Sequence, residues 1–214
     1  FVFEGLDARP VPSLFRDFSA PVRLEPQPVE DLTVLFAHDP NPFNRWEAGQ
    51  QIATRLLLDG IAEGSRIALP DSFVGAIDRL LADEGLDPAF VADAIILPSE
   101  AFLADQMAEI DVDAIHAVRE EARAQIGRVL AGRLRRRFDA LSDRGAPEID
   151  AAAMGRRALK NVCLAYLATS PAAIDLVVAQ AQRGTTMTDV LAALTILRDL
   201  DTPERPRLLG AFYD

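Results

Sequence analysis

The stretch DAIHAVREEARAQIGRVLAGRLRRRFDAL, residues 113–141, decides the fold of this chain. Its apolar residues return every three or four positions, which is the spacing of one face of an α-helix. The residues on this face are Ile115, Val118, Ala122, Ile126, Val129, Leu130, Leu134, Phe138 and Leu141. Arginines and glutamates occupy the opposite face. The pattern predicts a single helix of about thirty residues, roughly 45 Å long.

Helical spacing extends in both directions from this stretch, and local signals mark further helix ends. Asn41 before Pro42 is typical of a helix start. Asp71 is expected to cap the next helix, and Gly85 to close it. The other predicted helices cover residues 42 to 60 or 64, a short segment after 87, and about 150–169, 171–183 and 188–200.

Successive helices joined by short turns indicate a mainly α protein. We expect an irregular α-solenoid of antiparallel helix pairs, because several helices are apolar on more than one side. Tetratricopeptide and ankyrin arrays are disfavoured, since the sequence shows no regular repeat of about 33 or 34 residues.

The first part of the chain has a different pattern. The first 42 residues hold 7 of the 14 prolines, and apolar and polar residues alternate around Phe1 and Phe3 and around Val22 and Leu24. Alternation of this kind is typical of strands. A short β segment is therefore expected before the helices, with a boundary near residue 28.

The composition limits the classes of function. A formal net charge of −11 disfavours nonspecific binding to nucleic acid or to anionic membranes, because both need cationic side chains against phosphates. The longest apolar region, 162–181, is interrupted by Pro171 and Asp175, so no membrane span is predicted. The single cysteine, Cys163, fits a reducing compartment. We expect a cytoplasmic protein that binds neither nucleic acid nor membrane.

The sequence contains no recognisable catalytic or metal-binding motif. A His-Glu-x-x-His zinc helix cannot form, since the two histidines, His38 and His116, are followed by Asp39 and Ala117. His116 and Glu120 lie one helical turn apart, and we interpret this pair as a helix-surface interaction instead of a metal site. No catalytic, cofactor-binding or metal-binding residue is assigned.

Two further features allow a functional and a structural interpretation. Arg128, Arg133 and Arg135–Arg137 could bind phosphate or RNA, but a solvated helix face with cations near its C-terminal end is favoured. Trp46 is favoured as a core residue over an interface anchor, because large aromatic residues in helical domains are more often buried.

Five segments, taken in order, resemble the bacterial zinc aminopeptidases of the aminopeptidase N family. They are SLFRDFSAPV (13–22), NRWEA (44–48), LPSE (97–100), RALKNVCLAYL (157–167) and MTD (187–189). Short segments such as LPSE are easily matched by chance. Their ordered succession along nearly the whole chain carries the resemblance.

The resemblance implies a fragment without catalytic residues. In the family, His-Glu-x-x-His and a later Glu hold a zinc ion, and a Gly-x-Met-Glu-Asn loop holds the substrate amine. Here Met107, Met154 and Met187 are followed by Ala, Gly and Thr. Residues 1–28 would be the end of a β-sandwich domain and a linker. Residues 29–214 would be the N-terminal part of the C-terminal helical domain, which caps the active-site chamber.

On this interpretation the parent protein is a zinc aminopeptidase that removes N-terminal amino acids from peptides. The partner of this chain would be the catalytic domain of the same polypeptide. Within this interpretation, pairing of some of the arginines named above with its acidic residues is an intermediate option beside the favoured solvated face. The start at Phe1 instead of Met fits a segment of a longer protein. The alternative is a free-standing helical-repeat scaffold that binds a protein partner along its concave face.

Overall fold

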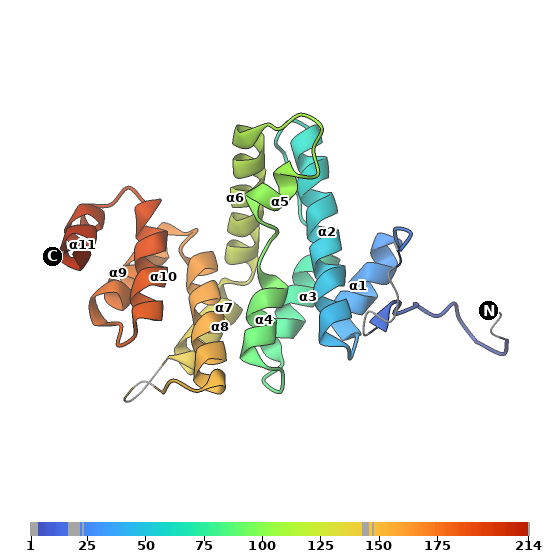
Figure 1. Cartoon of the computed structure of the whole chain (residues 1–214), viewed down its shortest axis with the longest axis horizontal. Helices are drawn as coiled ribbons and strands as arrows, with labels where there is room; N and C mark the ends of the chain where they lie inside the picture. The colour runs from blue at the N-terminus through green and yellow to red at the C-terminus, as the bar shows by residue number, and fades with distance from the viewer. Residues whose placement is uncertain (1–3, 17–21, 23, 143–145, 147, 214) are drawn as a thin grey trace.

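The computed structural model describes residues 4–16, 22, 24–142, 146 and 148–213. Within these residues the chain forms eleven α-helices, with a short 3₁₀ turn between α8 and α9 (Figure 1). The helices are α1 (Val29–His38), α2 (Pro42–Ala62), α3 (Asp71–Ala82), α4 (Pro88–Ile95), α5 (Glu100–Ala104), α6 (Val112–Val129), α7 (Ala131–Leu141), α8 (Ala151–Leu167), α9 (Ile174–Arg183), α10 (Met187–Arg198) and α11 (Glu204–Tyr213); the 3₁₀ turn, η2, is Pro171–Ala173.

One apolar core continues through most of the helices. Neighbours along the chain pack together, α1 on α2, α7 on α8 and α9 on α10. Contacts of α4 with α8 and of α2 with α6 join segments that are distant in the sequence. Figure 1 shows the helices following one another along the longest axis from α1 to α11. The prediction of a mainly α, solenoid-like fold is confirmed.

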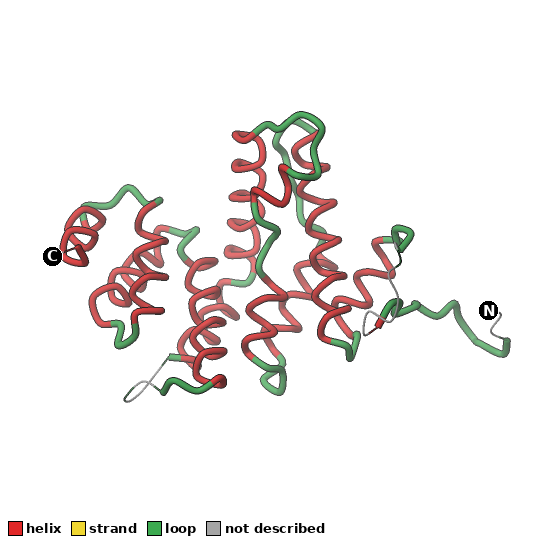
Figure 2. Tube along the Cα trace, in the orientation of Figure 1, coloured by secondary structure: helices red, strands yellow, loops and turns green. Residues whose placement is uncertain are grey.

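The short β segment expected before the helices is not seen. Figure 2 shows loop and helix but no strand among the described residues, and both Val22 and Leu24 are exposed outside any strand. A strand needs a neighbouring strand to complete its hydrogen bonds. We call residues 1–28 the arm. Near α1 and α2 the arm is held by side-chain contacts instead of strand pairing, and Asn44 Nδ2 of α2 donates to the Leu14 carbonyl oxygen at 2.7 Å. The alternation at Phe1 and Phe3 falls outside the described residues.

The prediction of one helix over residues 113–141 is wrong. α6 ends at Val129 and α7 begins at Ala131, because Leu130 leaves helical geometry with φ −99° and ψ 12°. The two halves have partly different neighbours, since α6 packs on α2, α5 and α8 while α7 packs on α3 and α8.

Close approach of two helices explains one glycine in this region. A Cβ added at Gly127 of α6 would lie 2.4 Å from the Tyr166 carbonyl oxygen in α8. Such a distance is far shorter than any van der Waals contact. Gly127 therefore lets α6 lie directly against the C-terminal end of α8.

The local signals for helix starts were right in two cases and wrong in a third. Asn41 caps α2 by accepting from the Asn44 amide at 3.0 Å, and Asp87 caps α4 by accepting from the Ala89 amide at 2.9 Å. Asp71 is not a cap, since it is the first residue of α3.

The predicted glycine stop of α3 is also wrong. The helix already ends at Ala82, and the Gly85 amide bonds to the Asp83 carboxylate at 2.9 Å. The Asp83 side chain thus stabilises the turn after α3 by accepting this hydrogen bond, whereas the sequence predicted that a glycine would end the helix.

Candidate functional site

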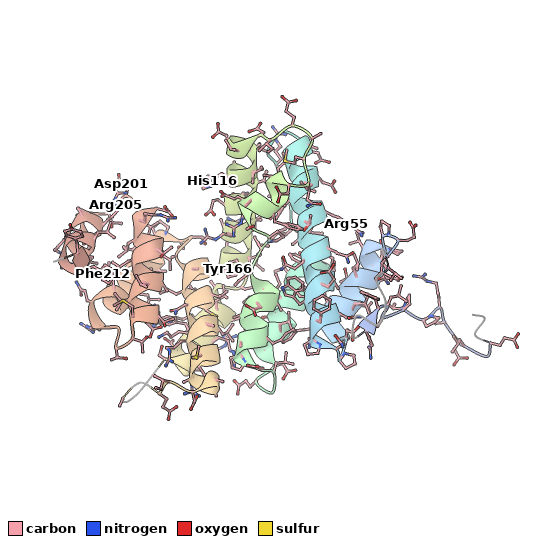
Figure 3. All side chains as sticks on the ribbon, viewed as in Figure 1. Arg55, His116, Tyr166, Asp201, Arg205 and Phe212 are labelled. Carbon is pink, nitrogen blue, oxygen red and sulfur yellow. The ribbon has the colours of Figure 1, made fainter. Side chains whose placement is uncertain are left out.

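A groove with both apolar and charged side chains on its wall lies between the middle and the C-terminal helices. α6, α8, α10 and the connection of residues 96–100 line its main hollow, which has a volume of about 680 Å³. A second hollow of about 520 Å³ continues along α6 and shares Glu120, Arg123 and Asp199 with the first. We call the two together the polar groove. Figure 3 shows His116 on the side of α6 that faces α10.

Opposite charges are paired along the wall of the polar groove. Arg123 Nη1 lies 2.6 and 2.7 Å from the two carboxylate oxygens of Glu120, and Arg123 Nη2 donates to the Ala165 carbonyl oxygen at 3.1 Å. Arg198 Nε lies 2.9 Å from Asp199 Oδ1. The hydrogen bond from Arg198 lowers the pKa of Asp199. The groove is consequently rich in charges but nearly balanced between cations and anions.

His116 pairs with a different residue from the one predicted. Its Nδ1 lies 2.8 Å from Glu100 Oε1, on α5, whereas Glu120 bonds to Arg123. α5 packs on α6 and brings Glu100 within reach of His116. The Glu120 carboxylate, one turn away from His116, is bonded to Arg123 instead. The hydrogen bond to Glu100 raises the pKa of His116.

The geometry around the histidines does not form a metal centre. Among the described residues, no group of three or more His, Cys, Asp and Glu side chains is placed to hold an ion. His38 ends α1, where Arg79 Nη1 lies 3.3 Å from its Nε2. Cys163 is not suited to act as a nucleophile or a metal ligand, because burial raises the pKa of its thiol to about 12.

The connection between α4 and α5 is held by side chains from three helices, and we call residues 95–98 the strap. The donors and accepting carbonyls are Tyr166 of α8 to Ile95, Gln50 of α2 to Ile96 at 2.8 Å, and Arg119 of α6 to Pro98 at 2.8 Å. Burial raises the pKa of the Tyr166 phenol, which stays a protonated donor at neutral pH. The strap forms one edge of the polar groove and is fixed along its length.

On the other side of the strap lies a second, more apolar hollow of about 620 Å³, which we call the aromatic groove. Phe43, Trp46, Phe90 and Ile96 contribute its apolar wall. The rings of Phe43 and Trp46 lie 5.6 Å apart between centroids. Trp46 is half-buried and packs at the edge of the core while also lining the groove. The core interpretation of Trp46 is therefore right only in part.

The arginines of α6 and α7 mostly have partners within this chain. Arg133 Nε lies 2.8 Å from Asp78 Oδ1 of α3, and this hydrogen bond raises the pKa of Arg133. Arg135 pairs with Asp139 one turn along the exposed face. Arg137 is buried, with 7% of its surface exposed, so the prediction of a solvated face fails at this position.

Sequence reasoning assigned no site residue and missed both grooves. The LPSE segment at 97–100 was one local signal near them, because a proline before a helix-capping serine marks a bent connection. His116 and Glu120, which line the polar groove, and Trp46, which lines the aromatic groove, were also considered, but the structural interpretation was favoured for each. Ser99 indeed caps α5 by accepting from the Phe102 amide at 3.1 Å. The side chains of α2, α6 and α8 that donate to the strap come from distant parts of the sequence, so no short sequence pattern reveals them.

None of the helices in the described ranges combines the length and the apolar character needed to cross a membrane.

Comparison with known proteins places the chain in a family. Residues 29–214 match the family model described as domain of unknown function (DUF3458_C) ARM repeats. The chain is 36% identical to aminopeptidase N of Caulobacter vibrioides over 99% of its own length, and 33% identical to aminopeptidase N of Escherichia coli over 100%. It spans 25% of the length of each of these relatives.

A solved structure gives the same result. The crystal structure of Legionella pneumophila aminopeptidase A in complex with aspartic acid is similar with a TM-score of 0.83 and 27% identity. The similarity covers 99% of this chain and 26% of that one. The resemblance to aminopeptidases predicted from short segments is confirmed. The chain belongs to the DUF3458_C family of ARM-repeat domains, and over its whole length it is similar to about a quarter of aminopeptidase N.

Proposed function

We propose that this chain is a non-catalytic segment of a zinc-dependent aminopeptidase, in which it caps the active-site chamber. The observation that carries the proposal is its similarity, from end to end, to one quarter of aminopeptidase N from two bacteria. The reaction of the parent protein would be the removal of N-terminal amino acids from peptides. Its catalytic domain would be the partner of this chain within one polypeptide.

The residues that the structure describes do not fit a zinc site. His116 is committed to Glu100, and its other neighbours in the polar groove are paired with arginines. His38 lies beside a guanidinium at the end of α1. The zinc of the proposed enzyme therefore belongs to a part of the polypeptide outside this chain, and no catalytic step is assigned to the residues described above.

The polar groove supports the proposed capping role. A peptide carries a positive amine, a negative carboxylate and many hydrogen-bonding groups, and a wall with paired charges of both signs can face all of them without a strong net field. Helices on rigid supports also suit a wall that limits access. We propose that α6, α8 and α10 form part of the chamber wall.

The proposal also concerns residues 1–28 and the location of the protein in the cell. Residues 1–28 would end a preceding β-sandwich domain and link it to the helices, and residues 29–214 would begin the helical domain. The arm contacts α1 through the ion pair of Arg9 and Asp31. The single buried cysteine supports a cytoplasmic location.

Activity assays on two lengths of polypeptide test the enzymatic proposal. The full polypeptide of the natural gene should release p-nitroaniline from aminoacyl-p-nitroanilides in the presence of zinc, while the 214-residue chain should not. Zinc-dependent turnover by the chain alone would contradict the non-catalytic role. A gene that lacks an upstream His-Glu-x-x-His motif would favour the alternative, a helical-repeat scaffold that binds a protein partner.

Substrate length tests the capping role. Thr195 is exposed and lines the polar groove, so Thr195→Trp in the full polypeptide should lower kcat/KM for longer peptides and leave small anilides unaffected. Ser72→Trp, on an exposed position of α3 outside both grooves, is the matched control. Equal effects on kcat/KM for short and long substrates would contradict the proposal that α6, α8 and α10 form part of the chamber wall.

A further inference from the structure

We propose that a hollow between the arm and the first two helices is a binding site for a small organic cation, namely an amine with an apolar body. The hollow has a volume of about 390 Å³, and we call it the arm pocket. The residues that line it include Leu14 and Leu24 of the arm, Leu32 and Leu35 of α1, and Phe43 and Glu47 of α2. Phe43 also borders the aromatic groove, but no described residue of the arm pocket borders the polar groove. The arm pocket is therefore a site apart from the proposed chamber wall.

The wall of the arm pocket is mainly apolar. Leu32 and Leu35 of α1 are buried. Leu14, Leu24 and Phe43 are each 39–43% exposed. Hollows of a few hundred Å³ with apolar walls and few polar groups are typical of small-molecule sites. An apolar ligand body would cover the exposed parts of these three side chains and remove them from water.

The arm pocket also contains a carboxylate that has no cation beside it. Among the described residues, Glu47 is the one acidic side chain that lines the pocket. It is partly buried, and Gln51 Nε2 donates to its Oε1 at 3.0 Å. No described arginine, lysine or histidine forms an ion pair with it, whereas Asp31 and Asp39 are each paired with an arginine of the arm. A partly buried carboxylate without a counter-charge loses hydration without compensation, so a cation beside Glu47 is favoured.

The polar atoms that remain free around the pocket are acceptors. The side-chain nitrogens of Asn44 and Gln27 donate to the backbone of the arm, and that of Gln51 donates to Glu47. The oxygens of the same three carboxamides accept no hydrogen bond from the described residues. An ammonium group has three N–H donors and no acceptor, so it matches these oxygens and the second oxygen of Glu47. A ligand carboxylate would find no free donor among these side chains.

The part of the wall that belongs to the arm is held in place without a ligand. Arg16 Nη2 lies 2.8 Å from Asp39 Oδ1, and Arg55 Nη1 of α2 donates to the Gln27 carbonyl oxygen at 2.7 Å (Figure 3). Phe15 lines the pocket with a φ of 56°, a left-handed backbone conformation that is strained for a bulky residue. Strain of this kind is concentrated at functional sites. An ordered wall also loses little conformational entropy when a ligand binds.

Three probes of similar shape and different charge test the proposal on the 214-residue chain. They are phenethylamine, which is a cation at neutral pH, the neutral phenethyl alcohol, and the anion hydrocinnamate. NMR titrations follow binding through the leucine methyl signals. The amine should bind at least about tenfold more tightly than the alcohol, because a hydrogen bond to a carboxylate is stronger when the donor is charged. The anion should bind more weakly than the alcohol, because it would lie beside Glu47 without a free donor.

A pair of glutamate variants tests the carboxylate. Glu47→Gln keeps an oxygen that can accept from Gln51 but removes the charge, and it should weaken binding of the amine about tenfold. Glu63→Gln, at an exposed residue directly after α2, is the matched control and should leave the affinity within about twofold, because an exposed charge is screened by solvent. This control accounts for the general attraction of a cation to a chain with a net charge of −11.

A pair of leucine variants tests the apolar wall. Leu14→Ala should weaken binding of the amine and of the alcohol alike, by about threefold or more, because both probes lose apolar contact. Leu6→Ala, at an exposed leucine of the same arm that does not line the pocket, is the matched control and should change neither affinity.

Each outcome decides the proposal. Equal binding of the amine and the alcohol, or tighter binding of hydrocinnamate, would overturn a cation site. Equal losses in Glu47→Gln and Glu63→Gln would show attraction to the net charge alone, and amine binding unchanged by Leu14→Ala would place the probe outside the arm pocket; either result would overturn the proposal too. If circular dichroism showed that Glu47→Gln does not fold, the three probes and Leu14→Ala would still decide. The anilide assay of the full polypeptide reports on the proposed function independently.

Discussion

Lys160 Nζ lies 2.6 Å from Asp189 Oδ2, and the two side chains are only 6% and 4% exposed. The pair joins α8 to α10. Asn161 donates to the other carboxylate oxygen at 3.1 Å, and Gln180 bridges Asn161 and the Asp189 carbonyl oxygen at 2.8 and 3.0 Å. Every oxygen of Asp189 thus has a donor, and the α9–α10 pair is fixed on α8 in one position.

Removing one member of this pair should destabilise the chain strongly. Lys160→Met leaves the Asp189 carboxylate buried without its cation, which costs about 3–5 kcal/mol of unfolding free energy. Urea denaturation measures the loss. The exposed Arg135 and Asp139 pair is the matched control, and Arg135→Gln should cost about 0.5 kcal/mol or less. Equal losses of unfolding free energy in the two variants would show that burial does not increase the contribution of the Lys160–Asp189 pair to stability.

The contact of α6 with α8 gives a prediction about glycine. Gly127→Ala would place a methyl group 2.4 Å from the Tyr166 carbonyl oxygen, so α8 must move and the unfolding free energy should fall by about 1–3 kcal/mol. Gly75→Ala, in the interior of α3 with open space around it, should instead add about 0.5–1 kcal/mol. Thermal unfolding of both variants should show shifts of opposite sign.

The sequence predicted what depends on nearby residues. Asn41 before Pro42 and Asp87 before Pro88 marked two helix starts, because a cap and its amide donor lie within three residues of each other. The break at Leu130 and the bond from Tyr166 to Ile95 were missed. Both depend on packing between segments far apart, and the second joins residues 71 positions apart. The apolar pattern across Leu130 is continuous, so it could not show that α7 turns toward new neighbours.

The ion pair in the polar groove predicts a pH effect on the histidine. Glu100→Gln should lower the pKa of His116, because the hydrogen bond to the Glu100 carboxylate is the main cause of its increase. NMR titration can follow this directly, since His38 is the only other histidine. An unchanged titration midpoint of His116 in Glu100→Gln would mean that this hydrogen bond does not form in solution.

The direction of the stability effect follows from the same pair. A folded-state pKa above the ordinary value of 6.5 means that the pair stabilises the fold fully below about pH 6.5 and that the effect is lost as pH rises through the higher folded value. Both side chains are largely exposed, so solvent screening should keep the contribution below about 0.5 kcal/mol. Urea denaturation of the chain and of Glu100→Gln should therefore differ slightly at pH 6 and agree at pH 9.

The last prediction concerns the single cysteine as a reporter of unfolding. Cys163 is fully buried in α8, and burial raises its thiol pKa to about 12, so little of the reactive thiolate exists at pH 8 and reagents cannot reach it. Native protein should react with Ellman's reagent far more slowly than protein in urea. Gly127→Ala should speed the native reaction, because it weakens the packing of α6 on α8, whereas Gly75→Ala should not. Rapid reaction of the native chain would contradict this prediction, because it would show that α8 opens without global unfolding.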